Sequence, residues 1–205
     1  MNNPQYVKLD GKLYKINSDF RVALECNELS ENTEIGDVER ALAIIYKLFS
    51  EEGLDCENQG KLLELGLKFL TLGKSEEDFK SSNKEKYELD FKKCEGLIRS
   101  SFKFDYNYDP YEMEYLHWYD FYRDLENLSS SEFGTCCALN RMISVLEMDT
   151  SLIKDTKQVS KIKEVQADFR KKYCKQKYKE LNTKEKTSVV DLYKSLGLWK
   201  GENRG

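Results

Sequence analysis

The chain has 205 residues, of which 40% are hydrophobic and 34% are charged, and its formal net charge is -4. The apolar share is large enough to build a core, while the charged share exceeds the usual value of about 25%. Only two prolines are present, which permits long helices. No run of about 18 apolar residues occurs, so we expect no membrane span.

The cysteines favour a reducing compartment. The six cysteines are scattered, apart from the neighbours Cys136 and Cys137. The N-terminal residues MNNPQYVKLDGK have no apolar signal core. Reduced thiols in a cytosol explain this usage better than a disulfide framework does.

The net charge hides an asymmetry along the chain. Residues 1–150 contain 18 Lys and Arg against 30 Asp and Glu, whereas residues 151–205 contain 15 against 7. An acidic body with a basic tail could pair with itself, with a second copy or with an acidic partner. The simpler interpretation is a solvated charged helix, so self-association is kept as an alternative.

The first predicted element is a β-hairpin over residues 6–16. Asp10 and Gly11 lie between two alternating apolar runs, and this dipeptide favours a turn in which both residues have positive φ. A ribbon of two strands is marginal alone, so we expect it to lean on helices or on another sheet.

Two amphipathic helices are predicted next. Ser18 or Asn17 can cap the first, and Asp19 suits the dipole of its first turn. Apolar intervals of three and four residues predict the second helix between Thr33 and Gly53.

A third helix, apolar on most sides, is predicted to be buried and to stop at Gly73. The polar residues 74–86 lack periodicity and are interpreted as a surface loop. The amphipathic pattern returns in a fourth helix that starts at Phe91 and includes Phe102.

The stretch YEMEYLHWYDFY, residues 111–122, holds six aromatic residues and the only histidine of the chain. Asp109 at a cap, Pro110 in the first helical position and Glu112 at the third predict that a fifth helix starts here. Leu128 is the last apolar position of this pattern.

On that fifth helix, one stripe would carry four aromatic side chains, and we predict it to be a partner-binding surface. Its residues are Tyr111, Tyr115, Trp118 and Tyr122. The favoured interpretation for Leu116, Trp118 and Phe121 is packing in the core, with the tyrosine hydroxyls and His117 reaching polar partners at its rim.

Two more helices complete the pattern. Ser129 or Ser131 can cap a sixth, and a long basic helix is predicted over residues 154–179. The prediction is therefore a mainly α fold of six to seven helices with an N-terminal hairpin. It forms a single domain over residues 1–180, followed by a tail segment over residues 181–205.

No arrangement of residues predicts an enzyme, a cofactor or a metal site. A pair of His117 with Cys136 or Cys137 is conceivable, but no local signature supports it. The chain has no Gly-rich phosphate loop and no GxSxG or HExxH motif. Adjacent cysteines on a helix point about 100° apart and do not readily share one ion.

The basic helix raises a second functional alternative, nucleic-acid binding. Its lysines alternate with Phe169, Tyr173 and Tyr178, and basic residues with aromatics can follow a phosphate backbone and stack on bases. Nucleic-acid binders are usually basic overall, whereas this chain is acidic, so we do not favour this partner.

Three further motifs are distinctive: INSDFRVAL at residues 16–24, EYLHW at residues 114–118 and EFG…NR at residues 132–141. Together they resemble the bacteriophage gene-product-fifteen family of long-tailed phages and prophages. A FDYNYD stretch stands before EYLHW, and a Lys-rich helix follows. The resemblance covers roughly residues 6–178 and leaves the tail without a counterpart.

The resemblance implies a role in phage tail assembly. Genes of this family usually lie between those for the tail-tube and tape-measure proteins, a position typical of tail assembly chaperones. The expected function is to hold the tape-measure protein in the host bacterial cytoplasm before the tube polymerises, with the tail-tube protein as a further partner. The alternative is a structural tail component retained in the virion.

Overall fold

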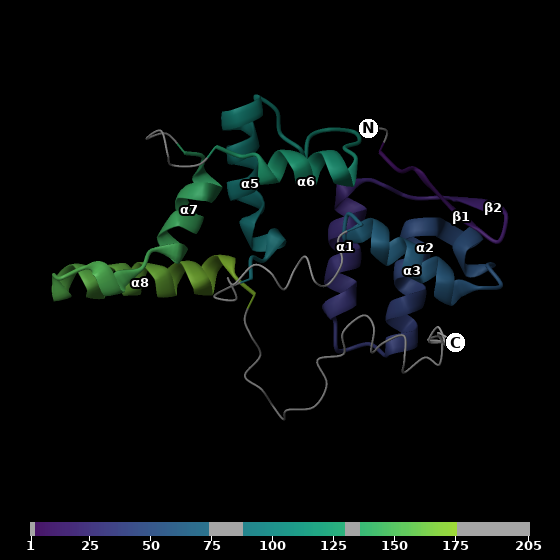
Figure 1. The fold of residues 1–205 in the computed structure, drawn as a ribbon, viewed down its shortest axis with the longest axis horizontal. Helices are drawn as coiled ribbons and strands as arrows, with labels where there is room; N and C mark the ends of the chain where they lie inside the picture. The colour runs from purple at the N-terminus through teal and green to yellow at the C-terminus, as the bar shows by residue number, and fades with distance from the viewer. Residues whose placement is uncertain (1–2, 74–87, 130–135, 176–205) are drawn as a thin grey trace, which may run out of the picture. The chain divides into compact units, whose positions relative to one another are not determined.

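The structure, a computed structural model, describes residues 3–73, 88–129 and 136–175. Within these ranges the chain is mainly helical, with seven α-helices and an N-terminal antiparallel hairpin, which confirms the predicted fold class (Figure 1). The predicted loop 74–86 and the tail segment 181–205 lie outside the described residues.

The described residues fall into two compact units. Unit 1 comprises residues 3–73 together with 117–119, and unit 2 comprises the remaining described residues. The predicted single domain over residues 1–180 stays a prediction.

Unit 1 begins with the hairpin of β1 (Tyr6–Leu9) and β2 (Lys12–Lys15), in which Tyr6 pairs with Lys15. Asp10 and Gly11 have φ values of 49° and 84°, so both turn positions adopt the predicted left-handed conformation. Leu9 and Tyr14 are buried, and this side of the ribbon packs into the core of the unit.

Three helices complete unit 1: α1 (Phe20–Glu31), α2 (Asp37–Leu54) and α3 (Gln59–Leu70). The cap of α1 is Asp19, so the predicted cap at Ser18 or Asn17 is wrong. The Asp19 carboxylate accepts a hydrogen bond from the Arg21 backbone N–H at 2.9 Å and pairs with its guanidinium at 2.7 Å. A carboxylate held by two donors of one residue outcompetes the hydroxyl of Ser18.

The helices α2 and α3 approach closely at Gly66. A Cβ built on Gly66 would lie 2.8 Å from Leu48 Cδ1 and 3.1 Å from Phe49 Cε2. The helix α2 bends at Ser50, where φ is 58°, and continues to Leu54. The predicted stop at Gly53 is therefore wrong by one residue.

Unit 2 is built from α5 (Phe91–Tyr106), α7 (Ala138–Glu147), the 3-10 helix η2 (Thr150–Leu152), α8 (Thr156–Tyr173) and most of α6 (Trp118–Glu126). The first two residues of α6 belong to unit 1. The rings of Phe102 and Phe121 stack at 5.5 Å between centroids in the core of unit 2.

The cap of α7 is Cys137, whose sulfur accepts from the Asn140 N–H at 3.5 Å. A cap at Ser129 is therefore wrong, and Ser131 lies outside the described residues. The Ser129 hydroxyl instead donates to Asp105 at 2.7 Å. The long basic helix is confirmed between Thr156 and Tyr173, and residues 176–179 of the predicted range are not described.

The predicted start of the fifth helix at Pro110 is wrong, because α6 begins at Trp118. Asp109 does form a turn, in which its carboxylate accepts from the Tyr111 N–H at 3.1 Å. Its other oxygen accepts from Arg99 Nε at 2.8 Å, and Glu112 pairs with the same guanidinium at 3.2 Å. Asp109 and Glu112 therefore bind Arg99 of α5, and the turn does not continue as a helix.

Within the described ranges, no helix combines the length and the apolar content that a bilayer-spanning segment needs.

Two Gly→Ala substitutions should have opposite effects on stability, one at the contact of α2 with α3 and one, as a control, at an open position of α5. Gly66→Ala should lower the free energy of unfolding by about 1–3 kcal/mol, because the added methyl group collides with Leu48. Gly96→Ala in α5 meets no atom within 4 Å and should stabilise by up to about 1 kcal/mol. Urea unfolding of both variants checks this, and a stabilised Gly66→Ala would contradict the packing described.

The Asp109 turn predicts a pH dependence. Burial alone would raise the pKa of the Asp109 carboxyl, but hydrogen bonds from Arg99, the Tyr111 N–H and Lys103 lower it below its usual value. The stabilisation is therefore present above the unfolded pKa of about 3.9 and is lost as pH falls through the folded value.

We expect Asp109→Asn to lose about 1–2 kcal/mol of stability at pH 7. The difference from the parent chain should begin to shrink below about pH 4, where the carboxyl of the unfolded parent chain takes up a proton, and should go on shrinking as the pH falls to the lower pKa of the folded carboxyl. Urea titrations at pH 7 and pH 3.5 measure both values, and an equal difference at the two pH values would argue against the ionised turn.

Candidate partner-binding surface

Trp118 is an internal anchor of unit 1. Its backbone N–H donates to the Ser18 carbonyl oxygen at 2.8 Å, and its indole Nε1–H donates to the Leu70 carbonyl oxygen at 3.1 Å. Only 2% of the residue is exposed. The Trp118 indole therefore satisfies a carbonyl group at the end of α3. The Trp118 backbone binds Ser18, which stands directly before the cap of α1.

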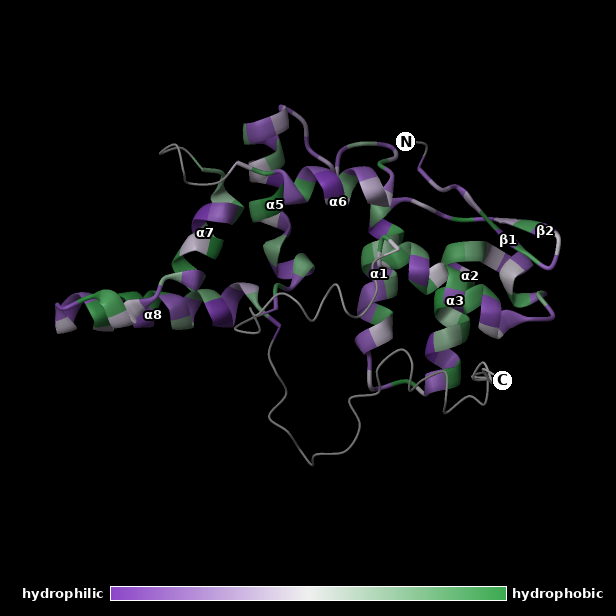
Figure 2. Ribbon diagram, viewed as in Figure 1, coloured by the Kyte–Doolittle hydropathy of each residue, from purple (hydrophilic) through white to green (hydrophobic). Residues whose placement is uncertain are grey.

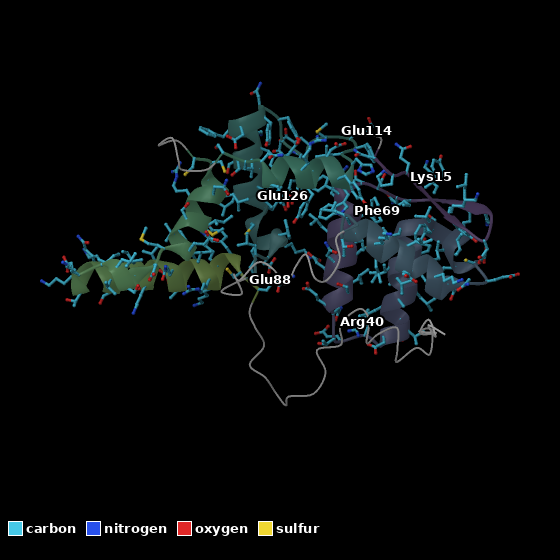
Figure 3. The ribbon with its side chains drawn as sticks, in the orientation of Figure 1. Lys15, Arg40, Phe69, Glu88, Glu114 and Glu126 are labelled. Carbon is cyan, nitrogen blue, oxygen red and sulfur yellow. The ribbon has the colours of Figure 1, made fainter. Side chains whose placement is uncertain are left out.

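His117 is held just as firmly. Its Nδ1 accepts from the Tyr119 backbone N–H at 3.0 Å, so the neutral ring carries its proton on Nε2 and donates it to the Pro4 carbonyl oxygen at 3.0 Å. Phe69, labelled in Figure 3, stacks on Tyr119 at 5.3 Å and meets the His117 ring edge-on at 6.0 Å. The imidazole is a structural connector of the N-terminal segment.

The four aromatic residues of the predicted stripe do not share a helix, since two of them precede α6. Tyr111 is half-buried, with the Arg99 guanidinium 5.8 Å from its ring, and burial raises the pKa of its hydroxyl to about 12. Tyr115 is 47% exposed, and Tyr122 is half-buried. A partner-binding role for these tyrosines stays a prediction, whereas Trp118 has its indole inside unit 1.

Within neither unit does the structure form the conceivable Cys–His pair. His117 belongs to unit 1, and Cys137 caps α7 in unit 2. Burial raises the pKa of the Cys26 and Cys94 thiols to about 12, which keeps both protonated near neutral pH. In the described part of the chain, no group of three or more His, Cys, Asp or Glu residues could hold a metal ion.

Three exposed apolar side chains of unit 2 lie at the end of α7, in η2 and in the middle of α8, and Phe104 of α5 is exposed as well. Leu152 is 84% exposed, Met148 44% and Val165 41%. Gln166 is the buried residue of α8, and its side-chain amide donates to the Met148 carbonyl oxygen at 3.0 Å, which places Met148 beside α8.

We call this region the α8–η2 surface. It consists of Met148, Leu152, Val159, Ile162 and Val165. The helix η2 packs on α8, and Val159 and Ile162 are half-buried on the side of α8 that carries Gln166. Figure 2 shows hydrophobic and hydrophilic bands alternating along α8, as expected for an amphipathic helix.

Basic side chains border the apolar face of α8. At 100° per residue, Lys163 and Arg170 lie along one side of this face and Lys161 along the other, while Glu164 and Asp168 lie on the opposite side. Among the described residues, Lys161, Lys163 and Arg170 have no ion-pair partner. The α8 part of the surface is therefore an apolar strip with a positive rim, while the acidic caps Asp149 and Asp155 stand at the starts of η2 and α8.

Sequence reasoning identified the basic amphipathic helix but did not find this surface. The periodicity that predicts α8 also predicts that its apolar face is buried. Only packing reveals that one residue, Gln166, is fully covered and that Leu152 is left exposed. The available signal was the triplet Val159, Ile162 and Val165 between lysines, a pattern typical of partner-binding helices.

Comparison with known proteins assigns a family to most of the chain. A family model described as Bacteriophage Gp15 protein matches residues 1–171, which include the whole α8–η2 surface and its rim. No curated protein and no solved structure matches the chain.

The anchoring role of Trp118 predicts that Trp118→Phe lowers the free energy of unfolding by about 2 kcal/mol. The phenyl ring has no donor for the buried Leu70 carbonyl oxygen and fills less space. Tyr46→Phe is the control within unit 1, because Tyr46 is 50% exposed and should change stability by less than about 0.5 kcal/mol. Equal stabilities of the two variants would refute the anchor.

Proposed function

The chain belongs to the bacteriophage Gp15 protein family, and from that premise we propose that it is a non-enzymatic tail assembly chaperone. It would hold the tape-measure protein in the host bacterial cytoplasm before the tail tube polymerises around it. The family's usual gene position, between the tail-tube and tape-measure genes, supports this role.

The observation that carries the proposal is the α8–η2 surface. A holding protein needs accessible apolar side chains for another helix and enough rim charge to stay dispersed. Leu152 and Val165 supply the first, and Lys161 and Lys163 supply the second. All four lie in the part of the chain that the family model matches.

The modest size of this surface suits a transient hold. An apolar strip on one helix and one 3-10 turn gives moderate affinity for each copy, so tube subunits can displace it. Several copies along one rod-shaped partner would together hold it firmly.

One observation favours a second function, nucleic-acid binding. Residues 154–175 contain eight Lys and Arg against three Asp and Glu, a local excess of positive charge. A gel shift that weakens steeply with salt and disappears on reversing the charge of Lys161 and Lys163 would favour it. No shift at low salt would exclude it.

Co-expression with the cognate tape-measure protein tests the proposal. The soluble fraction of that protein should rise severalfold when this chain is present, because its apolar stripe is covered. The double variant Leu152→Ser and Val165→Ser should lose most of this effect.

The matched control for that double variant is Tyr6→Ser with Leu13→Ser, which removes two exposed apolar side chains from the hairpin. It should protect the tape-measure protein as well as the parent chain does. A tape-measure protein whose solubility is the same with and without this chain would contradict the chaperone function. Stoichiometric amounts of the chain in purified virions would instead support a structural tail component.

A further inference from the structure

We propose that the α8–η2 surface takes an amphipathic helix whose apolar stripe is bordered by acidic side chains. This inference rests on the proposed holding function for the kind of partner, and it adds the chemistry by which that partner is chosen. Three features of unit 2 lead to it: how α8 is attached, what its free half exposes, and which charges border it.

The attachments of α8 lie in its second half. The Gln166 amide donates to the carbonyl oxygens of Val145 and Met148 at 2.9 and 3.0 Å, which joins α8 to the end of α7. At the end of α8, the Tyr173 carbonyl oxygen accepts from the Asp90 N–H at 2.9 Å. The helix also contacts η2, and the apolar residues Val159 and Ile162 of its first half are half-buried.

The apolar side chains between Val159 and Val165 have the spacing that a partner helix needs; Val165 is exposed, while Val159 and Ile162 are half-buried. Val159, Ile162 and Val165 follow one another at intervals of three residues, and Leu152 of η2 adds a fourth apolar group. Such intervals place side chains on adjoining strips of one helix face, where a second helix can lay its own i, i+3, i+4 stripe. The part of α8 from Thr156 to Val165 spans roughly 15 Å, room for about three turns of a partner.

Charge selects among the helices that would fit. The rim of the face carries Lys161, Lys163 and Arg170, and no acidic side chain of α8 lies on that side. A helix with lysines beside its stripe would place like charges together, whereas Glu or Asp in those positions would form ion pairs. The rim therefore favours acidic borders and disfavours basic ones.

Two other ligands would use the surface in different ways. A nucleic acid needs the positive rim but not the exposed Leu152, and its binding would not depend on an apolar stripe. An anionic membrane would use both, but it has no preferred arrangement of acidic residues along a stripe. These differences decide how the test is built.

The test uses the full chain and four labelled peptides of about 18 residues. Three share one apolar i, i+3, i+4 stripe bordered by Glu, by Lys or by Gln, and the fourth has the Glu composition with its stripe scrambled. Fluorescence anisotropy at 0.1 M salt measures each dissociation constant. We expect the Glu-bordered peptide to bind about tenfold more tightly than the Gln-bordered one, and the Lys-bordered and scrambled peptides to bind more weakly still.

Reversing the charge of two rim lysines gives the most decisive comparison. Lys161→Glu with Lys163→Glu should exchange the ranking, so that the Lys-bordered peptide binds better than the Glu-bordered one. The control Lys8→Glu with Lys15→Glu makes the same charge change on exposed lysines of the hairpin and should leave the ranking as it is. Thermal unfolding of both variants verifies that they fold like the parent chain.

Several results would overturn the proposal. They are equal binding of the Glu- and Lys-bordered peptides, equal binding of the scrambled peptide, and binding of anionic vesicles or DNA without any peptide binding.

The failure of the proposed function can be told apart from the failure of this inference. If the peptides bind in the predicted order and the tape-measure protein gains no solubility, the surface chemistry stands and the chaperone role falls. If the tape-measure protein is protected and charge reversal leaves the peptide ranking unchanged, the chaperone role stands and the proposed surface chemistry falls.

Discussion

The hydrogen bonds of the buried residues His117 and Trp118 determine the conformation of the aromatic segment 111–122. Trp118 closes the end of α3 and the start of α1 with two hydrogen bonds, and His117 holds the carbonyl of Pro4. These bonds fix the chain just before and within the first turn of α6. An isolated amphipathic helix through this segment would forfeit them and leave buried carbonyl groups unsatisfied, which costs about 1–3 kcal/mol for each group.

This constraint redirects the search for a partner surface. Tryptophan and tyrosine are common at interfaces, so the aromatic segment is the first place to look. Its tryptophan, Trp118, is instead buried inside unit 1. Exposed apolar groups of unit 2 lie at η2 and α8, where Gln166 joins α8 to the end of α7. The proposed function therefore rests on this half-covered helix.

Local rules of sequence predict much of the fold. The Asp10-Gly11 turn and the periodicity of α2, α3, α5 and α8 each specify their element without help from distant residues. The start of the fifth helix fails because the residues of its capping box bind Arg99, 13 positions before Glu112. No local pattern reports that competition.

The candidate surface is predictable only in part, for a related reason. A basic amphipathic helix can be recognised from Val159, Ile162 and the lysines around them, but how far its apolar face is covered depends on the length and position of α7 and η2.

Hydrogen–deuterium exchange of the chain with and without the cognate tape-measure protein tests this account most directly. We predict that binding slows exchange at residues 148–170 and leaves residues 109–122 unchanged. New protection confined to residues 109–122 would contradict it.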